Sequence, residues 1–376
     1  MKRITLITTF LIGCVCLIAQ DRLTPELLWQ LGRVSGLGLS ADGKQVIYSV
    51  SIPDAKENKS NRKYYSVPVQ GGQPVELASI KSIVPDKSIS PDGKFQISVQ
   101  AVKIQKVFGT DYYPEFDKSN VQIYDALNYR HWDTWEDGEY NHVFLHPLTN
   151  GNRGPGKDLM HGEPHDCPQM PFGGDEDYTW SPDSKKIIYV TKKKTGKSYA
   201  VSTNTDLYEY NIAAGATTNL TEGMMGYDTE PAFSTGGALA WLSMKRDGYE
   251  SDKNNIIVRS GGIITNLTQQ WDGTVAHFKW SPDGKKIYFT AAIEGTVQLF
   301  EVDFPGFTKK APVVKQITKG VFDITSIVGQ TGNTLVVSRT DMNHAAELYT
   351  VNLTNGQIAQ LSHVNDAAYG KRKMSK

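Results

Sequence analysis

The chain has 376 residues, with 40 Lys and Arg against 40 Asp and Glu, so its formal net charge is zero. A balanced charge gives no electrostatic reason to expect nucleic acid or an acidic membrane surface as a partner. The longest basic runs are K-K-K at 192–194 and K-R-K near the end, and we expect both to be solvated turns.

Residues 1–19 have the pattern of a secretory signal peptide. Two basic residues precede an apolar run from Ile4 to Ala19, which is too short to be a good membrane span. We expect cleavage after Ala19 and a periplasmic or secreted protein with no membrane span once the signal is removed. The sequence L-I-G-C at 11–14 leaves lipid anchoring at Cys14 as an alternative.

Segment 20–36 is predicted to contain one short helix. In L-T-P-E-L-L-W-Q-L-G, Thr24 is a suitable N-cap, Pro25 suits the first helical position, and Gly32 is a natural end.

From residue 37 onward one sequence motif recurs along the chain. F-K-W-S-P-D-G-K-K-I-Y-F-T-A at 278–291 nearly matches Y-T-W-S-P-D-S-K-K-I-I-Y-V-T at 178–191, and related copies begin at residues 37, 87, 231 and 327. The turn positions lie 50, 91, 53, 47 and 49 residues apart. Each copy has an apolar strand, an S-P-D-G turn and an alternating strand, which together predict a hairpin. A second strand pair follows each hairpin.

Four short antiparallel strands per unit are typical of a β-propeller blade. We therefore predict an all-β fold with a propeller over 37–366. It has six blades, or seven if the N-terminal strand or degenerate sequence supplies one more.

The spacing of 91 residues, longer than the others, indicates an insertion at about 104–141 that is rich in aromatic and acidic residues. Excursions from a scaffold often carry function. The candidate substrate-binding residues within it are Arg130, Trp132, Trp135, Glu136 and Asp137. Aromatic faces and carboxylates together can bind an amine by ion pairing and cation–π attraction. The alternative is that the tryptophans only anchor the excursion to its blade while the charges face water.

A second polar stretch, H-G-E-P-H-D-C at 161–167, contains the metal-binding residue types His161, His165, Asp166 and Cys167. Its glycine and proline favour a loop over a helix, so we expect neither a metal nor another cofactor here. Cys167 is also the one cysteine left after removal of the signal, so no disulfide within the chain is expected.

The chain contains no G-x-S-x-G pentapeptide, the usual signature of an α/β-hydrolase nucleophile. We therefore assign no catalytic residue. A site in the central channel would need acids or histidines clustered on the innermost strands, and no convincing set is apparent.

Three features carry a resemblance to a known family. They are the S-P-D-G blades, the insert Y-R-H-W-D-T-W-E-D-G followed by N-H-V-F-L-H-P-L-T-N-G, and the run E-L-Y-T-V-N-L-T-N-G-Q-I-A-Q-L-S-H-V-N-D. Over residues 20–370 the chain resembles the propeller of exported prolyl oligopeptidase-family serine peptidases. The most similar branch is the bacterial dipeptidyl-peptidase 5-like and acylaminoacyl-peptidase-like one.

The resemblance implies a propeller that covers an α/β-hydrolase domain carrying Ser, Asp and His, with the tail 367–376 at the point where that domain would begin. It implies short peptides with a free N-terminus as substrates. By position, Glu136 and Asp137 would hold that terminus, although the local motif differs from the paired-glutamate form of related peptidases. The predicted function is the substrate-gating propeller of an exported serine exopeptidase of the dipeptidyl-peptidase type. The alternative is a stand-alone periplasmic binding or scaffold propeller without activity.

Overall fold

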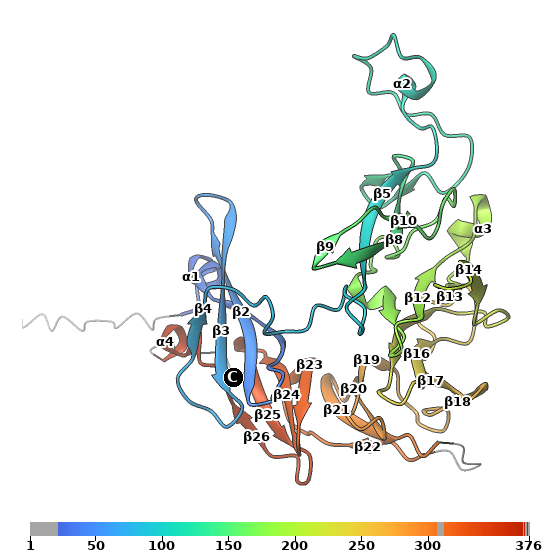
Figure 1. Cartoon of the computed structure of the whole chain (residues 1–376). Helices are drawn as coiled ribbons and strands as arrows, with labels where there is room; N and C mark the ends of the chain where they lie inside the picture. Colours follow the sequence, from blue (N-terminus) through green and yellow to red (C-terminus); the bar gives the residue numbers. More distant parts are fainter. Residues whose placement is uncertain (1–21, 307–311, 371, 373, 375–376) are drawn as a thin grey trace, which may run out of the picture.

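The computed structural model describes residues 22–306, 312–370, 372 and 374, so the predicted signal peptide lies outside the described residues. Six four-stranded antiparallel sheets are arranged around a common centre, as Figure 1 shows. The predicted all-β propeller is confirmed, with six blades among the described residues. The predicted N-terminal helix is confirmed as α1 (Pro25–Gln30), where the Thr24 hydroxyl accepts a hydrogen bond from Leu27 N–H at 3.2 Å.

The blades follow one another along the chain. Blade 1 contains β1 (Arg33–Leu39), β2 (Gln45–Asp54), β3 (Lys59–Pro68) and β4 (Val75–Leu77). Blade 2 contains β5 (Phe95–Lys103), β8 (Glu139–Thr149), β9 (Asn152–Arg153) and β10 (Lys157–Asp158). Blade 3 contains β11 (Tyr178–Trp180), β12 (Lys186–Thr191), β13 (Asp206–Asn211) and β14 (Ala216–Asn219).

The second half of the ring repeats the pattern. Blade 4 contains β15 (Asp228–Phe233), β16 (Leu239–Ser243), β17 (Asn255–Ser260) and β18 (Ile263–Asn266). Blade 5 contains β19 (Val275–Trp280), β20 (Lys286–Ile293), β21 (Thr296–Asp303) and β22 (Lys315–Gln316). Blade 6 contains β23 (Asp323–Thr331), β24 (Thr334–Asp341), β25 (His344–Asn352) and β26 (Ile358–Gln360), and α4 (Asp366–Tyr369) follows it.

The repeated S-P-D-G phrase builds the hairpin turn between the first two strands of a blade. In the copy at 281–284, the Ser281 hydroxyl donates to Asp283 Oδ1 at 2.6 Å and accepts from Lys286 N–H at 2.9 Å. Gly284 has a φ of 67°, the left-handed region that favours glycine. The tryptophan before the turn also joins blades, because the Trp280 indole donates to the Ala232 carbonyl of blade 4 at 3.0 Å. The repetition in the sequence therefore encodes both the turn and a contact between blades.

Buried apolar residues form five clusters, and each cluster lies between two neighbouring blades: 2 and 3, 3 and 4, 4 and 5, 5 and 6, and 6 and 1. Among the described residues no such cluster joins blades 1 and 2, and Figure 1 shows these blades (blue and teal) standing apart. Within residues 22–306 and 312–370, no strand from the first or last blade completes a blade at the other end. The ring is thus packed through five joints and lacks an apolar core at the sixth.

Blades 6 and 1 are held by close packing and by one buried amide. Gly36 approaches Val328 so closely that a Cβ on residue 36 would lie 2.3 Å from a valine methyl. Asn365, just before α4, accepts from Gly32 N–H at 2.8 Å and donates to the Gly32 carbonyl at 3.0 Å. These contacts replace the strand exchange that would otherwise close a ring.

The excursion in blade 2 spans the residues between the end of β5 at Lys103 and the start of β8 at Glu139. It contains α2 (Gly109–Tyr112) and a small hairpin of β6 (Arg130–His131) and β7 (Thr134–Trp135), and its outer part projects from the ring in Figure 1. Blade 3 has its own excursion, α3 (Gly196–Val201), between β12 and β13. No helix in the described part of the chain has the length and hydropathy needed to cross a membrane.

Candidate functional site

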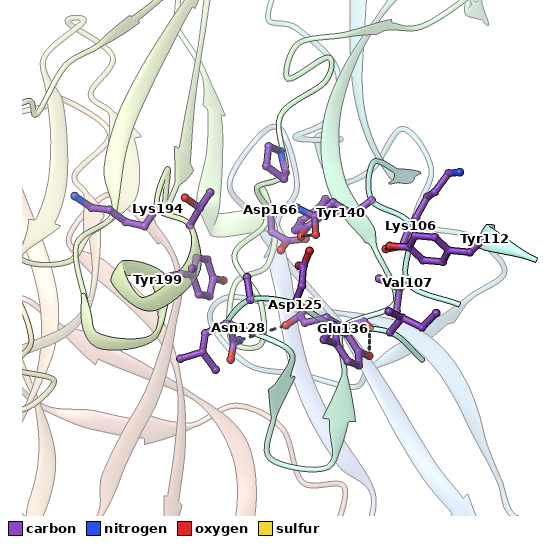
Figure 2. Close-up of a pocket in the computed structure, with 18 residues that line it drawn as sticks. Lys106, Val107, Tyr112, Asp125, Asn128, Glu136, Tyr140, Asp166, Lys194 and Tyr199 are labelled. Carbon is purple, nitrogen blue, oxygen red and sulfur yellow. Dashed lines mark hydrogen bonds between the residues drawn. The ribbon is translucent and has the colours of Figure 1, made fainter. Parts of the chain in front are cut away.

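A cavity of about 350 Å³ lies where the excursions of blades 2 and 3 meet. The blade 2 excursion and β8 supply one wall, the 161–167 loop contributes Pro164 and Asp166, and the segment 194–199 supplies the opposite wall. Figure 2 shows the residues around this pocket. It is the site at which the candidate insertion meets the rest of the propeller.

Glu136 is the one residue of the five sequence candidates that lines this cavity. It follows β7, and both polar groups of its backbone are hydrogen-bonded. Its N–H donates to the Tyr129 carbonyl at 3.0 Å, and its carbonyl accepts from the Tyr124 hydroxyl at 2.5 Å. Its carboxylate accepts a long hydrogen bond of 3.4 Å from the Asn128 amide. Burial, and then the charge of Asp137, raise the pKa of Glu136.

Asp125 and Asp166 also contribute carboxylates to the lining, and the candidate set included neither as a substrate-binding residue. One of the Asp166 oxygens accepts from Asn141 N–H of β8 at 2.8 Å. Burial, together with the charge of Glu136, raises the pKa of Asp166 to about 6, although the Asn141 hydrogen bond opposes the shift. Neither Asp166 nor Glu136 forms a salt bridge within the part of the chain that the structure describes.

Tyrosines complete the lining, and the cations point elsewhere. Tyr140 and Tyr199 both line the cavity, and burial followed by the nearby carboxylate charges raises the pKa of each. In Figure 2 the Tyr199 ring, carried by α3, directs its hydroxyl toward the carboxylate side. Lys106 and Lys194 also line the cavity, but Figure 2 shows their ammonium ends turned outward. The interior is therefore acidic, aromatic and poorly solvated.

The other four candidates lie outside the cavity. Arg130 stacks its guanidinium over the Trp135 ring at 5.4 Å, and Trp135 in turn stacks on Tyr124 with ring centres 5.9 Å apart. Trp132 is 70% exposed at the tip of the β6–β7 hairpin. The Asp137 carboxylate accepts from Glu139 N–H at 2.8 Å and so caps the start of β8.

Trp135 does border a shallow depression beside the cavity, together with Tyr124, Asp125, Leu127 and Tyr129. Trp135 thus lies at the rim of the cavity, and Trp132 lies at the tip of the hairpin.

The residues of the 161–167 loop point in different directions. The His161 side chain is 94% exposed, whereas Cys167 is fully buried and its thiol lies 3.9 Å from the Asp177 carbonyl. His165 is also buried. No group of three or more His, Cys, Asp or Glu residues suited to a metal occurs in the described ranges. Asp166 alone of this loop's ligand types reaches the cavity.

The K-K-K run at 192–194 was predicted to be a solvated turn, and this prediction is wrong. All three lysines are only partly exposed, and Lys193 forms a 2.6 Å ion pair with Glu163. The run follows β12 directly, so it lies at the base of the blade 3 excursion, and Lys194 itself lines the cavity.

The relatives and the solved structures that resemble this chain include peptidases and a peptidase propeller domain. No family model matches the chain. Among solved structures, it superposes on an acylaminoacyl peptidase in complex with Z-Gly-Gly-Phe-chloromethyl ketone with a TM-score of 0.67, covering 94% of this chain and 56% of that one at 15% identity. The β-propeller domain of the trilobed protease from Pyrococcus furiosus, described as having an open velcro topology, gives 0.51, covering 89% of this chain and 99% of that one at 19% identity. At these identities the two structures support the fold alone.

Curated relatives with higher sequence identity identify the chain more specifically than the solved structures do. Dipeptidyl-peptidase 5 of Porphyromonas gingivalis is 35% identical over 394 residues, which is 92% of this chain and 56% of the relative. The protein of the same name from Porphyromonas endodontalis is 34% identical with the same coverage. The chain is therefore a homologue of the dipeptidyl-peptidase 5 proteins over nearly all of its length, as the resemblance of its blades predicted, and it spans about half the length of these relatives.

Proposed function

We propose that the chain is the substrate-gating propeller of an exported serine exopeptidase of the dipeptidyl-peptidase type, and that the cavity binds the free amino terminus of a short peptide. The observation that carries this proposal is the pair of desolvated carboxylates, Glu136 and Asp166, which share one cavity and form no ion pair among the described residues. An ammonium group entering the cavity would supply the positive charge that both carboxylates lack, and each could accept a strong charge-assisted hydrogen bond from it.

The tyrosines fit the same ligand. Tyr140 and Tyr199 offer hydroxyl groups and ring faces, and a ring face attracts a cation by its quadrupole. A cavity of about 350 Å³ accommodates a terminal residue or two and excludes a folded chain. A site that fixes the amino terminus would set how far along the peptide the scissile bond lies, which is the geometry that a dipeptidyl peptidase needs.

Catalysis in this proposal belongs to an α/β-hydrolase domain, the expected partner of the propeller, because the chain itself contains no G-x-S-x-G nucleophile. The purified chain is then expected to bind short peptides without cleaving them. Turnover of a dipeptidyl chromogenic substrate by this chain, or its labelling by a fluorophosphonate, would contradict the division of roles.

The binding role can be tested directly on the chain by isothermal titration calorimetry with Ala-Phe-amide and with its N-acetylated form. We expect the free amine to bind and the acetylated peptide to bind at least tenfold more weakly. Glu136→Gln and Asp166→Asn should each weaken binding of the free amine by about tenfold, since each removes one charge-assisted bond. Asp133→Asn, at an exposed position on the same hairpin, is the matched control and should bind like the wild type. Equal binding of the two peptides would refute the amine site.

Export is also proposed, from the charged and apolar pattern of residues 1–19. Expression of the full chain in a Gram-negative host, followed by fractionation and N-terminal sequencing, should recover a periplasmic protein that begins at Gln20. A cytoplasmic protein that retains Met1 would count against it.

A further inference from the structure

The cavity is assembled from two sides that are distant in sequence, and one ion pair joins them. Glu163 stands in the loop that carries Asp166, and Lys193 stands in the segment that leads to Tyr199. The Lys193 ammonium and Glu163 Oε1 are 2.6 Å apart, and both side chains are about two-thirds buried or more, with exposures of 26% and 32%. A partly buried pair at this distance is screened little by solvent and holds the two segments at a fixed separation.

Nothing else in the described structure holds the Glu163 carboxylate. Its second oxygen, Oε2, is buried without a hydrogen-bond partner, and its backbone carbonyl accepts from His142 Nε2 at 2.9 Å. Without Lys193, a largely buried carboxylate would be left with no counter-charge, which favours rotation of the side chain and its loop toward water. Asp166, three residues further on, lies in that same loop.

Lys192 acts on the other wall. Its ammonium lies 4.3 Å from the centre of the Tyr199 ring, which is a cation–π contact. The end of α3 is tied to blade 4, because Asp247 Oδ1 accepts from the Ser202 hydroxyl at 2.7 Å and from Thr203 N–H at 2.8 Å. Tyr199 is thus held between an anchored helix end and the lysine run.

We propose that Lys192 and Lys193 position the two walls of the amine cavity, with Lys193 setting their separation through Glu163 and Lys192 fixing the Tyr199 ring. This inference rests on the proposed amine-binding function and adds positioning residues to it. Neither Lys192 nor Lys193 lines the cavity, so each acts through another residue.

The test measures binding of Ala-Phe-amide and of its N-acetylated form to the full chain. Lys193→Met keeps the length of the side chain and removes its charge, and we expect it to weaken binding of the free amine about fivefold to tenfold. Lys193→Arg, which retains a cation within reach of Glu163, should restore binding to within about twofold of the wild type. Lys192→Met should weaken binding by about threefold. Lys197→Met, an exposed lysine on α3 itself, is the matched control and should change nothing.

A double-mutant cycle separates positioning from general destabilisation. If the ion pair carries the effect, Lys193→Met combined with Glu163→Gln is no weaker than either single variant. Additive losses, or failure of Lys193→Arg to restore binding, would overturn the proposal, and so would wild-type affinity in Lys193→Met. If that variant is too unstable to assay, the Glu163→Gln and Lys193→Arg variants still decide the question. The proposed amine site fails by a different result, namely wild-type affinity in Glu136→Gln and Asp166→Asn.

Discussion

Replacing Asp166 by Asn should make the empty protein more stable while it weakens binding of the free amine. The Asp166 side chain is about nine-tenths buried, and its one described side-chain hydrogen bond is to a backbone N–H of β8. An amide has the same shape as the carboxyl group and keeps an oxygen to accept that bond, but it carries no charge to desolvate.

The magnitude follows from the raised pKa. Burial moves the pKa of Asp166 from 3.8 to about 6, and at about 1.4 kcal/mol per pH unit this difference corresponds to about 3 kcal/mol at neutral pH. The folded state holds the Asp166 proton more tightly than the unfolded chain does. The wild type therefore loses stability as the pH rises from about 4 to 6, and the full cost is present above pH 6. Since an amide oxygen is a weaker acceptor than a carboxylate, we expect a net gain of about 1–3 kcal/mol for Asp166→Asn.

Urea denaturation followed by tryptophan fluorescence at pH 7.5 and at pH 4 would measure this difference. The gain should be present at pH 7.5 and nearly absent at pH 4, where the wild-type carboxyl group is already neutral when folded. Asp133→Asn, at an exposed site, should show no gain at either pH. A loss of stability that is the same at both pH values would refute the view that a buried charge is the source.

Three further predictions concern the site and the ring. Binding of the free amine should weaken as the pH falls through about 6, where Asp166 gains its proton, and again above about 8, where the peptide amine loses its own; a Kd that is flat from pH 5 to 7.5 would contradict this. Asn365→Ala removes two backbone bonds between blades 6 and 1 and should destabilise the chain by about 2–4 kcal/mol in urea, whereas Asn61→Ala on the exposed strand β3 should cost less than about 0.5 kcal/mol. Trp280→Phe removes the indole bond to the Ala232 carbonyl and should cost about 1–2 kcal/mol, and a change below about 0.3 kcal/mol would show that this repeated contact does not stabilise the ring.

Much of the fold was predictable because its information is local. The Ser281 and Asp283 side chains bond to backbone groups within five residues, so each turn is specified by its own few residues wherever the phrase occurs. The degenerate copy at 231–244 keeps part of this set, since the Ser234 hydroxyl accepts from Ala238 N–H at 3.0 Å. The insertion was detectable for the same reason, as a stretch in which the local pattern stops.

The second half of the cavity was not predictable because it depends on contacts between blades. Asp166 and Tyr199 lie 30 and 63 residues beyond Glu136, in segments with no shared pattern. Only the packing of blade 3 against blade 2 brings them together. The choice between Glu136 and Asp137 also needed the structure, because neighbouring residues of an extended segment point to opposite sides. One of these carboxylates therefore enters the cavity while the other caps β8.

The position of the cavity within the ring has a mechanical consequence. Both of its walls belong to blades 2 and 3, which share one core cluster in which Ile97 and Val143 of blade 2 pack with Ile187 and Tyr189 of blade 3. The joint without an apolar cluster lies on the other side of blade 2, toward blade 1. A separation of blades 1 and 2 would therefore widen the ring beside the cavity without parting Glu136 and Asp166 from Tyr199. A disulfide engineered across the joint between blades 2 and 3 should leave amine affinity unchanged for this reason, and a tenfold change would show that the cavity walls move relative to each other when the peptide binds.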